Sequence, residues 1–222
     1  MHQQVAPVKP RRRYDSRRRQ RQALRTRAAI LDAAQHLFFS RGYAATTIAL
    51  IAETADVSVE TIYKGFGGKP GLVRAIWERG LEGAGPIPAE RRSDAMSGTE
   101  LDARKVISNW GVLTSEVAPR VAPILLLIRT AAANDPEMQA LQEEADGARL
   151  ARMEHNARVL YERGDFRDGV TLDYARDVLW VYSAPELFEL LVIRRSWSLE
   201  DYGGLIADGM IAALLPALSR HT

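Results

Sequence analysis

The segment SVETIYKGFGGKPGL, residues 58–72, groups hydroxyls, a carboxylate, a phenol and two ammonium groups around a glycine-rich turn. Hydroxyls, lysines and the N–H groups of helix N-termini are the groups with which proteins hold phosphates. Carboxylates and small apolar groups contact the edges of bases. The glycines at 65, 67 and 68 let two backbones approach closely. This combination of residue types favours contact with a nucleic acid.

A helix that begins at Ser58 would carry base-reading groups on its first turn. Glu60 can accept a hydrogen bond from a cytosine amino group, and Val59 can contact a thymine methyl group. The candidates for base contacts are Ser58, Val59, Glu60 and Thr61.

The candidates for phosphate contacts are Tyr63, Lys64 and Lys69. The phenol and the first ammonium group lie farther along the same helix. Lys69 begins the next helix, whose N-terminal N–H groups also favour an anion. Two other interpretations stay open here: Tyr63 could fill a core, and Lys64 could be a solvated surface charge.

A helix-turn-helix is the element that the sequence predicts around these groups. Apolar residues at helical spacing over Thr26–Ser40 predict a first helix that stops at Gly42. The following segment predicts two short helices separated by residues 55–57, with Thr46 and Ser58 as N-caps. The second helix of such a motif lies in the major groove of DNA, although the same outline also arises in other all-helical proteins.

An arginine-rich arm precedes the first helix. Residues 1–27 hold ten Lys and Arg against Asp15 alone, a net charge of about +9, whereas the other 195 residues carry a net −7. A dense block of like charge favours disorder and binding to a polyanion, so we expect residues 1–23 to be a disordered arm. Arg25 and Arg27 are predicted to contact DNA in a salt-dependent, sequence-independent way. The alternative is a solvated tail that only aids solubility.

The composition argues against an enzyme, a metal site and a membrane protein. The 222 residues are 46% apolar, enough for a core, and the lack of cysteine excludes disulfides and thiolate ligands. The segment GFGGKPG lacks the spacing of a nucleotide-binding loop, and no histidine has metal-ligand spacing. The apolar run Ile124–Ile128 is too short to span a membrane. We therefore expect a cytoplasmic protein with no enzyme activity, cofactor or metal. The histidines are His2, His36, His155 and His221.

A Gly- and Pro-rich segment, residues 82–98, is predicted to be irregular and to divide the chain. The predicted fold is all-α, with an N-terminal three-helix helix-turn-helix domain, a C-terminal helical domain and about nine to ten helices in total. Helical patterns occur at 69–82, 99–116, 119–133, 136–163, 171–182, 184–194 and 198–218, and no segment has the pattern of a strand. The predicted domains are a basic arm at 1–23, a DNA-binding domain at 24–82 and an effector-binding and dimerisation domain at 98–222.

The stretch AAILDAAQHLFFSRGYAATTIALIAETADVSVETIYKGFGGKPGLVRAIW carries several landmark residues in a fixed order. They are Gly42-Tyr43, Thr46-Thr47, Ile51-Ala52, Val57-Ser58, Thr61-Ile62-Tyr63, Phe66 and Lys69. In this order, residues 24–80 resemble the N-terminal domain of the TetR family of bacterial one-component repressors. Gly65 departs from the pattern, because many members carry a histidine or another polar side chain there. Asp56 also departs, standing where glycine is common.

The resemblance implies a TetR-like, all-helical homodimer that binds double-stranded DNA. It implies that Thr47, Tyr63 and Lys69 contact phosphates and that residues 58–64 read bases. It also implies that the C-terminal domain binds a small-molecule effector.

The C-terminal half contains side chains that could hold such an effector by burial and a few polar contacts. The predicted ligand-binding residues are Trp110, Arg129, Met153, His155, Trp180 and Tyr182. The alternative is that the aromatic members of this set belong to the core.

Surplus apolar residues in the last two helical segments predict a dimer. Two helices from each subunit would form a four-helix bundle, and a two-fold dimer predicts a near-palindromic operator. The predicted interface residues are Leu187, Leu191, Leu205, Met210 and Leu214. The alternative is that this surplus packs inside one subunit.

We expect a sequence-specific transcriptional regulator, a repressor that a small-molecule effector releases from a near-palindromic operator. The alternative is an architectural, nucleoid-type DNA-binding protein that uses the arginine-rich arm without effector control. A ligand-sensing C-terminal domain would distinguish the two.

Overall fold

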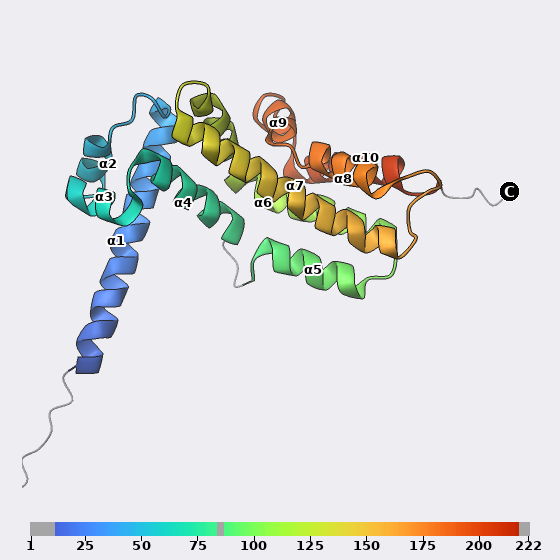
Figure 1. Cartoon of the computed structure of the whole chain (residues 1–222), viewed down its shortest axis with the longest axis horizontal. Helices are drawn as coiled ribbons and strands as arrows, with labels where there is room; N and C mark the ends of the chain where they lie inside the picture. The colour runs from blue at the N-terminus through green and yellow to red at the C-terminus, as the bar shows by residue number, and fades with distance from the viewer. Residues whose placement is uncertain (1–11, 84–86, 218–222) are drawn as a thin grey trace, which may run out of the picture. The chain divides into compact units, whose positions relative to one another are not determined.

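The structure, a computed structural model, describes residues 12–83 and 87–217, with side chains from residue 17 onward. All regular elements in these ranges are helical, which confirms the predicted all-α class (Figure 1). The elements are α1 (Arg12–Arg41), α2 (Ile48–Thr54), α3 (Val59–Phe66), α4 (Lys69–Glu82), α5 (Ala89–Thr99), α6 (Ala103–Ala132), α7 (Pro136–Glu162), α8 (Leu172–Tyr182), α9 (Pro185–Phe188), the π-helical turn η1 (Glu189–Ile193) and α10 (Leu199–Leu214).

Contacts divide the chain into two compact units, Met1–Leu72 and Val73–Thr222, called unit 1 and unit 2 below. This division falls within α4. The domain ranges expected from composition, 24–82 and 98–222, stay predictions, because a division by contacts does not test which segments fold independently.

The core of unit 1 joins α1 to α2 and α3. Ile30, Leu37 and Phe38 of α1 are buried, as are Ile51 of α2 and Ile62 of α3. These residues lie at the helical spacing that the sequence predicts for a buried stripe.

The N-cap of α2 is Thr47, not Thr46. The Thr47 hydroxyl accepts a hydrogen bond from Leu50 N at 3.2 Å. Thr46 is fully buried instead, and its hydroxyl donates to Gly42 O at 2.8 Å and lies 3.2 Å from Leu37 O. The predicted cap is therefore wrong by one residue, because the first of the two threonines is needed to satisfy carbonyls at the end of α1.

The first helix is longer than predicted. It begins at Arg12, so residues 12–23 of the expected disordered arm are helical, while residues 1–11 lie outside the described residues. Arginine, glutamine, alanine and leucine all have high helix propensity, and no Gly or Pro interrupts Arg12–Arg41. Charge density alone therefore does not prevent a helix here.

The segment 82–98, expected to be irregular, contains most of α5. Pro88 is its N-cap residue, and the next helix-breaking residue, Gly98, lies near its end. Ser93 and Ser97, one turn apart, are buried where α5 packs against α6 and α7. Tertiary packing thus supports a helix that composition does not indicate.

The predicted break between residues 116 and 119 is also absent. α6 continues through Pro119 and Pro123 to Ala132 and packs along α7 and α10 (Figure 1). Among the described helices, α6 is the one with the length and hydropathy of a membrane-crossing helix. Its buried residues, including Val106, Ile107 and Trp110, belong to the core of unit 2, as in a core helix of a globular domain.

Candidate nucleic-acid interface and ligand cavity

The helix α3 is fixed by an N-cap residue at its start and by a glycine at its end. Ser58 Oγ accepts from Thr61 N at 3.2 Å and lies 2.8 Å from Thr61 Oγ1. Gly67 ends the helix with φ of 76°, a left-handed conformation that favours glycine. Ile62 is fully buried and anchors α3 against the rest of unit 1. The short helix is therefore held by both ends and one face.

The opposite face of α3 is open to solvent. Val59 is 40% exposed and Tyr63 is 52% exposed, so Tyr63 does not fill the core. Because the core of unit 1 does not bury these two side chains, both are available for contact with a partner. The predicted base and phosphate contacts on this helix, namely Ser58, Val59, Glu60, Thr61, Tyr63 and Lys64, are all exposed.

Two predicted phosphate contacts already hold structural positions in unit 1. Thr47 is exposed while it caps α2. Lys69 Nζ donates to Tyr43 O at 2.9 Å and lies 4.1 Å from the centroid of the Tyr43 ring. An ammonium group has three N–H donors, so this bond leaves donors for an anion near the start of α4.

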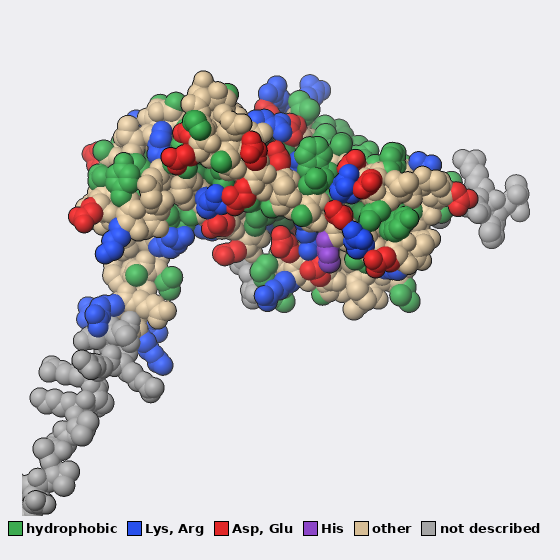
Figure 2. Space-filling model, viewed as in Figure 1, with side chains coloured by type: hydrophobic (Ala, Val, Ile, Leu, Met, Phe, Trp, Pro, Cys, Tyr) green, Lys and Arg blue, Asp and Glu red, His purple; other side chains and the backbone are tan. Residues whose placement is uncertain are grey.

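The arginines of α1 differ in their surroundings. The guanidinium carbon of Arg27 lies 4.6 Å from the centroid of the Phe66 ring, which ties α1 to the last turn of α3. Arg25 is exposed, and arginine side chains gather along this stretch of α1 (Figure 2). Arg27 thus stabilises the position of α3, and Arg25 lies open to an anion.

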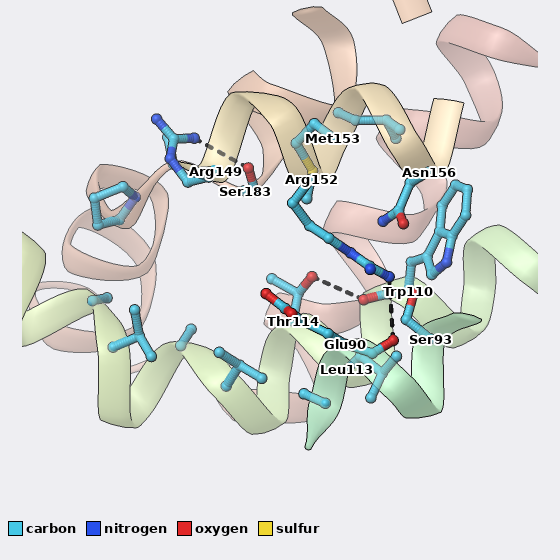
Figure 3. Close-up of a pocket in the computed structure, with 18 of the residues that line it drawn as sticks. Glu90, Ser93, Trp110, Leu113, Thr114, Arg149, Arg152, Met153, Asn156 and Ser183 are labelled. Atoms are coloured by element: carbon cyan, nitrogen blue, oxygen red, sulfur yellow. Dashed lines mark hydrogen bonds between the residues drawn. The ribbon is translucent and has the colours of Figure 1, made fainter. Parts of the chain in front are cut away.

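Unit 2 contains a largely apolar cavity of about 180 Å³. It lies between α5, α6, α7, α8, α9 and α10, and the close-up in Figure 3 shows its labelled polar and apolar side chains. Its apolar wall includes Trp110, Leu113, Val117, Val121, Leu125 and Met153, and its polar groups include Ser93, Thr114, Asn156 and Tyr202. A concave apolar space with a few polar groups is typical of a small-molecule site.

Two arginines beside the cavity are bound by protein groups. Arg149 Nη1 donates to Trp180 O at 2.6 Å and to Ser183 Oγ at 3.1 Å, and burial lowers the pKa of Arg149. Arg152 Nη2 donates to Asp94 Oδ1 at 2.6 Å, and this hydrogen bond lowers the pKa of Asp94. Both guanidinium groups therefore act first as links between helices.

The N-terminal part of the chain matches a known protein family. Residues 30–76 match the family model described as bacterial regulatory proteins, tetR family. This segment of the chain belongs to the TetR family.

The sequence similarity to known regulators covers about a third of the chain. The chain is 42% identical over 69 residues, 31% of its length, to the uncharacterized HTH-type transcriptional regulator YvkB of Bacillus subtilis. It is 47% identical over 60 residues, 27% of its length, to the HTH-type transcriptional regulator TtgR of Pseudomonas putida. The matched regions span 36% and 29% of these relatives, about a third of each.

The structural similarity extends over most of the chain. The SmeT–triclosan complex superposes with a TM-score of 0.67 and 26% identity, over 86% of this chain and 92% of SmeT. SmeT is the repressor of the multidrug efflux pump SmeDEF of Stenotrophomonas maltophilia. The TetR-like architecture thus includes both units of this chain.

The cavity of this chain contains two of the six predicted ligand-binding residues, Trp110 and Met153. Arg129 pairs with Glu186, and His155 is exposed with Nε2 3.2 Å from Asp94 Oδ1, so neither lines the cavity. The polar ends of both side chains have carboxylate partners outside the cavity, and a role of either residue in ligand binding stays a prediction.

Two predicted aromatic ligand contacts, Trp180 and Tyr182, have packing contacts in the structure. Trp180 lies under Arg149, with 4.3 Å between the guanidinium carbon and the ring centroid. The Tyr182 ring lies so close to Gly209 that a Cβ added there would overlap it. Neither residue lines the cavity. Both side chains are used in packing α8 against its neighbours.

Sequence reasoning missed the polar cavity residues Ser93, Asn156 and Tyr202. Ser93 lies in the segment expected to be irregular, so no helical face was predicted for it. Asn156 gave a usable signal, because it is a polar residue next to the apolar stripe of α7 at Met153, Ala157 and Leu160.

The predicted dimer residues separate into two groups. Met210 and Leu214 are buried in the core of unit 2, so their prediction as interface residues is wrong: the apolar surplus of α10 partly serves one subunit. Leu187 and Leu191 are half-buried and Leu205 is 40% exposed.

Exposed apolar side chains also occur on α8 and η1, the elements that precede α10 in the chain. Figure 2 shows hydrophobic side chains over the part of unit 2 that holds these elements. We call Val181, Leu190, Ile193 and Leu205, which are 40–54% exposed, the apolar face.

Proposed function

We propose that this chain is a DNA-binding transcriptional regulator that reads its operator with α3. The observation that carries the proposal is the exposed first turn of α3, held from behind by the buried Ile62. A rigid short helix with exposed carboxylate, hydroxyl and methyl groups suits the major groove, where these groups distinguish base pairs.

In this proposal, phosphate contacts position α3 without reading sequence. Tyr63 and Lys64 extend from α3, Thr47 from the start of α2, and Lys69 from the start of α4. The exposed arginines of α1, including Arg25, add a diffuse attraction to the duplex that weakens as salt rises.

We propose further that two copies associate through the apolar face. Exposed apolar side chains on neighbouring elements are typical of an interface between subunits. A two-fold dimer would set two α3 helices about 34 Å apart, one turn of the duplex, and would require a near-palindromic operator.

The cavity of unit 2 supports control of this binding by a small molecule. SmeT, the structural relative described above, was solved with triclosan. We propose that an effector in the cavity prefers a dimer geometry that does not fit the operator, and so releases the DNA as a repressor would. The change in DNA affinity cannot exceed the difference in effector affinity between the two geometries.

The test is selection of genomic fragments by the purified full-length protein, followed by affinity measurements on the selected site. Tyr63→Ala should weaken binding to selected and random DNA alike, by about tenfold for the loss of one phosphate contact. Glu60→Gln should instead change the preferred base at one position of each half-site. Tyr161→Ala is the matched control, because Tyr161 is a 47% exposed tyrosine at the C-terminal end of α7.

Two results would contradict the proposal. If Tyr63→Ala and Tyr161→Ala affect DNA equally, α3 does not dock on DNA. If the wild-type protein binds all fragments with one affinity, the architectural alternative replaces the regulator.

A further inference from the structure

Two largely buried residues that line the cavity have polar side chains without a hydrogen-bond partner in the part of the chain that the structure describes. Ser93 is 5% exposed, and its Oγ has no partner. Asn156 is 8% exposed, and no hydrogen bond of its side-chain amide is found among the described residues. Burying such groups without a partner is unfavourable, and native proteins rarely do so. The two side chains therefore fit a bound molecule that supplies the missing bonds.

Both side chains face the same region of the cavity. Ser93 comes from α5 and Asn156 from α7, and Figure 3 shows them on the same side of the cavity as Trp110. A serine hydroxyl both donates and accepts, and a side-chain amide donates through nitrogen and accepts through oxygen. Together they match a head group that can donate and accept at once.

The other polar groups of the cavity favour an uncharged ligand. Burial raises the pKa of Tyr202 to about 12, so its phenol is neutral at physiological pH. Arg152 is paired with Asp94, which lies outside the lining, and Glu90 contributes a carboxylate to the lining. The remaining cation, Arg149, donates to Trp180 O and Ser183 and has Asp146 as its carboxylate neighbour at 3.4 Å. Arg149 Nε is buried without a hydrogen-bond partner, but the two Nη atoms of this guanidinium group are already bonded, so an anion would have to compete with Asp146 for it.

The size of the cavity limits the apolar part of the ligand. Its volume is about 180 Å³, and a protein cavity of roughly 150 Å³ holds one benzene molecule. Trp110, Leu113 and Met153 provide the apolar wall.

We propose that the cavity binds an uncharged compound built on one substituted ring, whose hydroxyl head is held by Ser93 and Asn156. This inference rests on the proposed effector site and specifies its ligand chemistry. The apolar body is buried against the Trp110 side, and the head exchanges hydrogen bonds with the two unpartnered side chains.

Titration calorimetry of the full-length protein with three matched probes tests the ligand class. The probes are 4-propylphenol, propylbenzene without a head group, and the anion 4-propylbenzoate. We expect the phenol to bind about fivefold to tenfold more tightly than propylbenzene, the effect of one or two neutral hydrogen bonds. Equal binding of these two, tighter binding of the benzoate, or no binding of the phenol at millimolar concentration would overturn the proposal.

Ser93→Ala and Asn156→Leu test the assigned residues. Each should reduce the preference for the phenol over propylbenzene several-fold, with propylbenzene affinity little changed. Ser108→Ala, an exposed site on α6, is the control. Because Ser93→Ala removes one oxygen atom that has no partner, we expect it to fold, and an unchanged preference in this variant would contradict the assignment.

Failure of this inference is distinguishable from failure of the proposed function. If the phenol binds as expected and operator affinity does not change at saturation, the ligand chemistry holds and effector release fails. If a charged compound releases the operator equally from the wild type and from Ser93→Ala, effector control holds and this inference fails.

Discussion

Gly111→Ala tests the closest helix crossing in unit 2. At Gly111 of α6, an added Cβ would lie 2.5 Å from Gly203 O and 2.8 Å from Ala207 Cβ, both on α10. A backbone carbonyl cannot rotate away as the end of a flexible side chain can. The alanine variant must therefore push α6 and α10 apart along the core that surrounds Trp110.

The expected loss of stability follows from two opposing effects. Overpacking a close-packed core costs about 1–3 kcal/mol. Replacing glycine by alanine in a helix recovers up to about 1 kcal/mol. We expect a net destabilisation of about 1–2 kcal/mol, or a decrease in Tm of about 2–4 °C per kcal/mol for a protein of this size.

Thermal and urea unfolding, followed by circular dichroism, measure the effect. Gly147→Ala is the matched control, because Gly147 lies inside α7 and an added Cβ would have no atom within 4 Å. We expect this control to be more stable than the wild type by about 0.5–1 kcal/mol. If the two variants have equal stability, the close α6–α10 crossing is not present in solution.

Three further predictions concern the arm, the α3 cap and a surface ion pair. Removing residues 1–24 should flatten the dependence of DNA affinity on salt, and an unchanged slope would show that the arm does not contact DNA. Ser58→Ala should destabilise α3 by about 1 kcal/mol and weaken operator binding, since it removes the bond to Thr61 N; a change no larger than that of Ser108→Ala would contradict this role. The pKa of Asp94 is lowered in the fold by its hydrogen bond from Arg152, so its contribution to stability is present at neutral pH and is lost as pH falls through that lowered pKa. Unfolding measured from neutral to acidic pH should therefore show a smaller loss of stability in Asp94→Asn than in the wild type, and equal losses would count against the pair.

The helix-turn-helix could be predicted from sequence because its signals are local. A capping serine at 58, an apolar residue at 62 and a glycine at 67 lie within three helical turns and specify one short helix. The exposure of Tyr63 follows from the same spacing, because it lies next to the buried Ile62 on the solvent side.

The predictions from sequence were wrong where tertiary packing decides the structure. α5 contains a glycine and polar residues, yet its Ser93 and Ser97 are buried against the neighbouring helices. Pro119 and Pro123 do not end α6, whose neighbours α7 and α10 pack along it. Helix periodicity also could not separate Met210, which is in the core, from Leu205, which is exposed.

The cavity was the least predictable feature, since its lining comes from six helices. Aromatic residues were poor guides: Trp180 is used in packing with Arg149. Buried polar residues such as Asn156 were better guides, because a polar side chain without an internal partner is costly unless a ligand or water completes it.

Footprinting of the full-length protein on the DNA fragment it selects tests the central claim, that α3 reads the major groove from each subunit of a dimer. The account predicts two protected half-sites related by two-fold symmetry, with centres about 10 base pairs or a multiple apart, and loss of protection at both in Tyr63→Ala. A single asymmetric footprint, or full protection by the Tyr63→Ala variant, would contradict it.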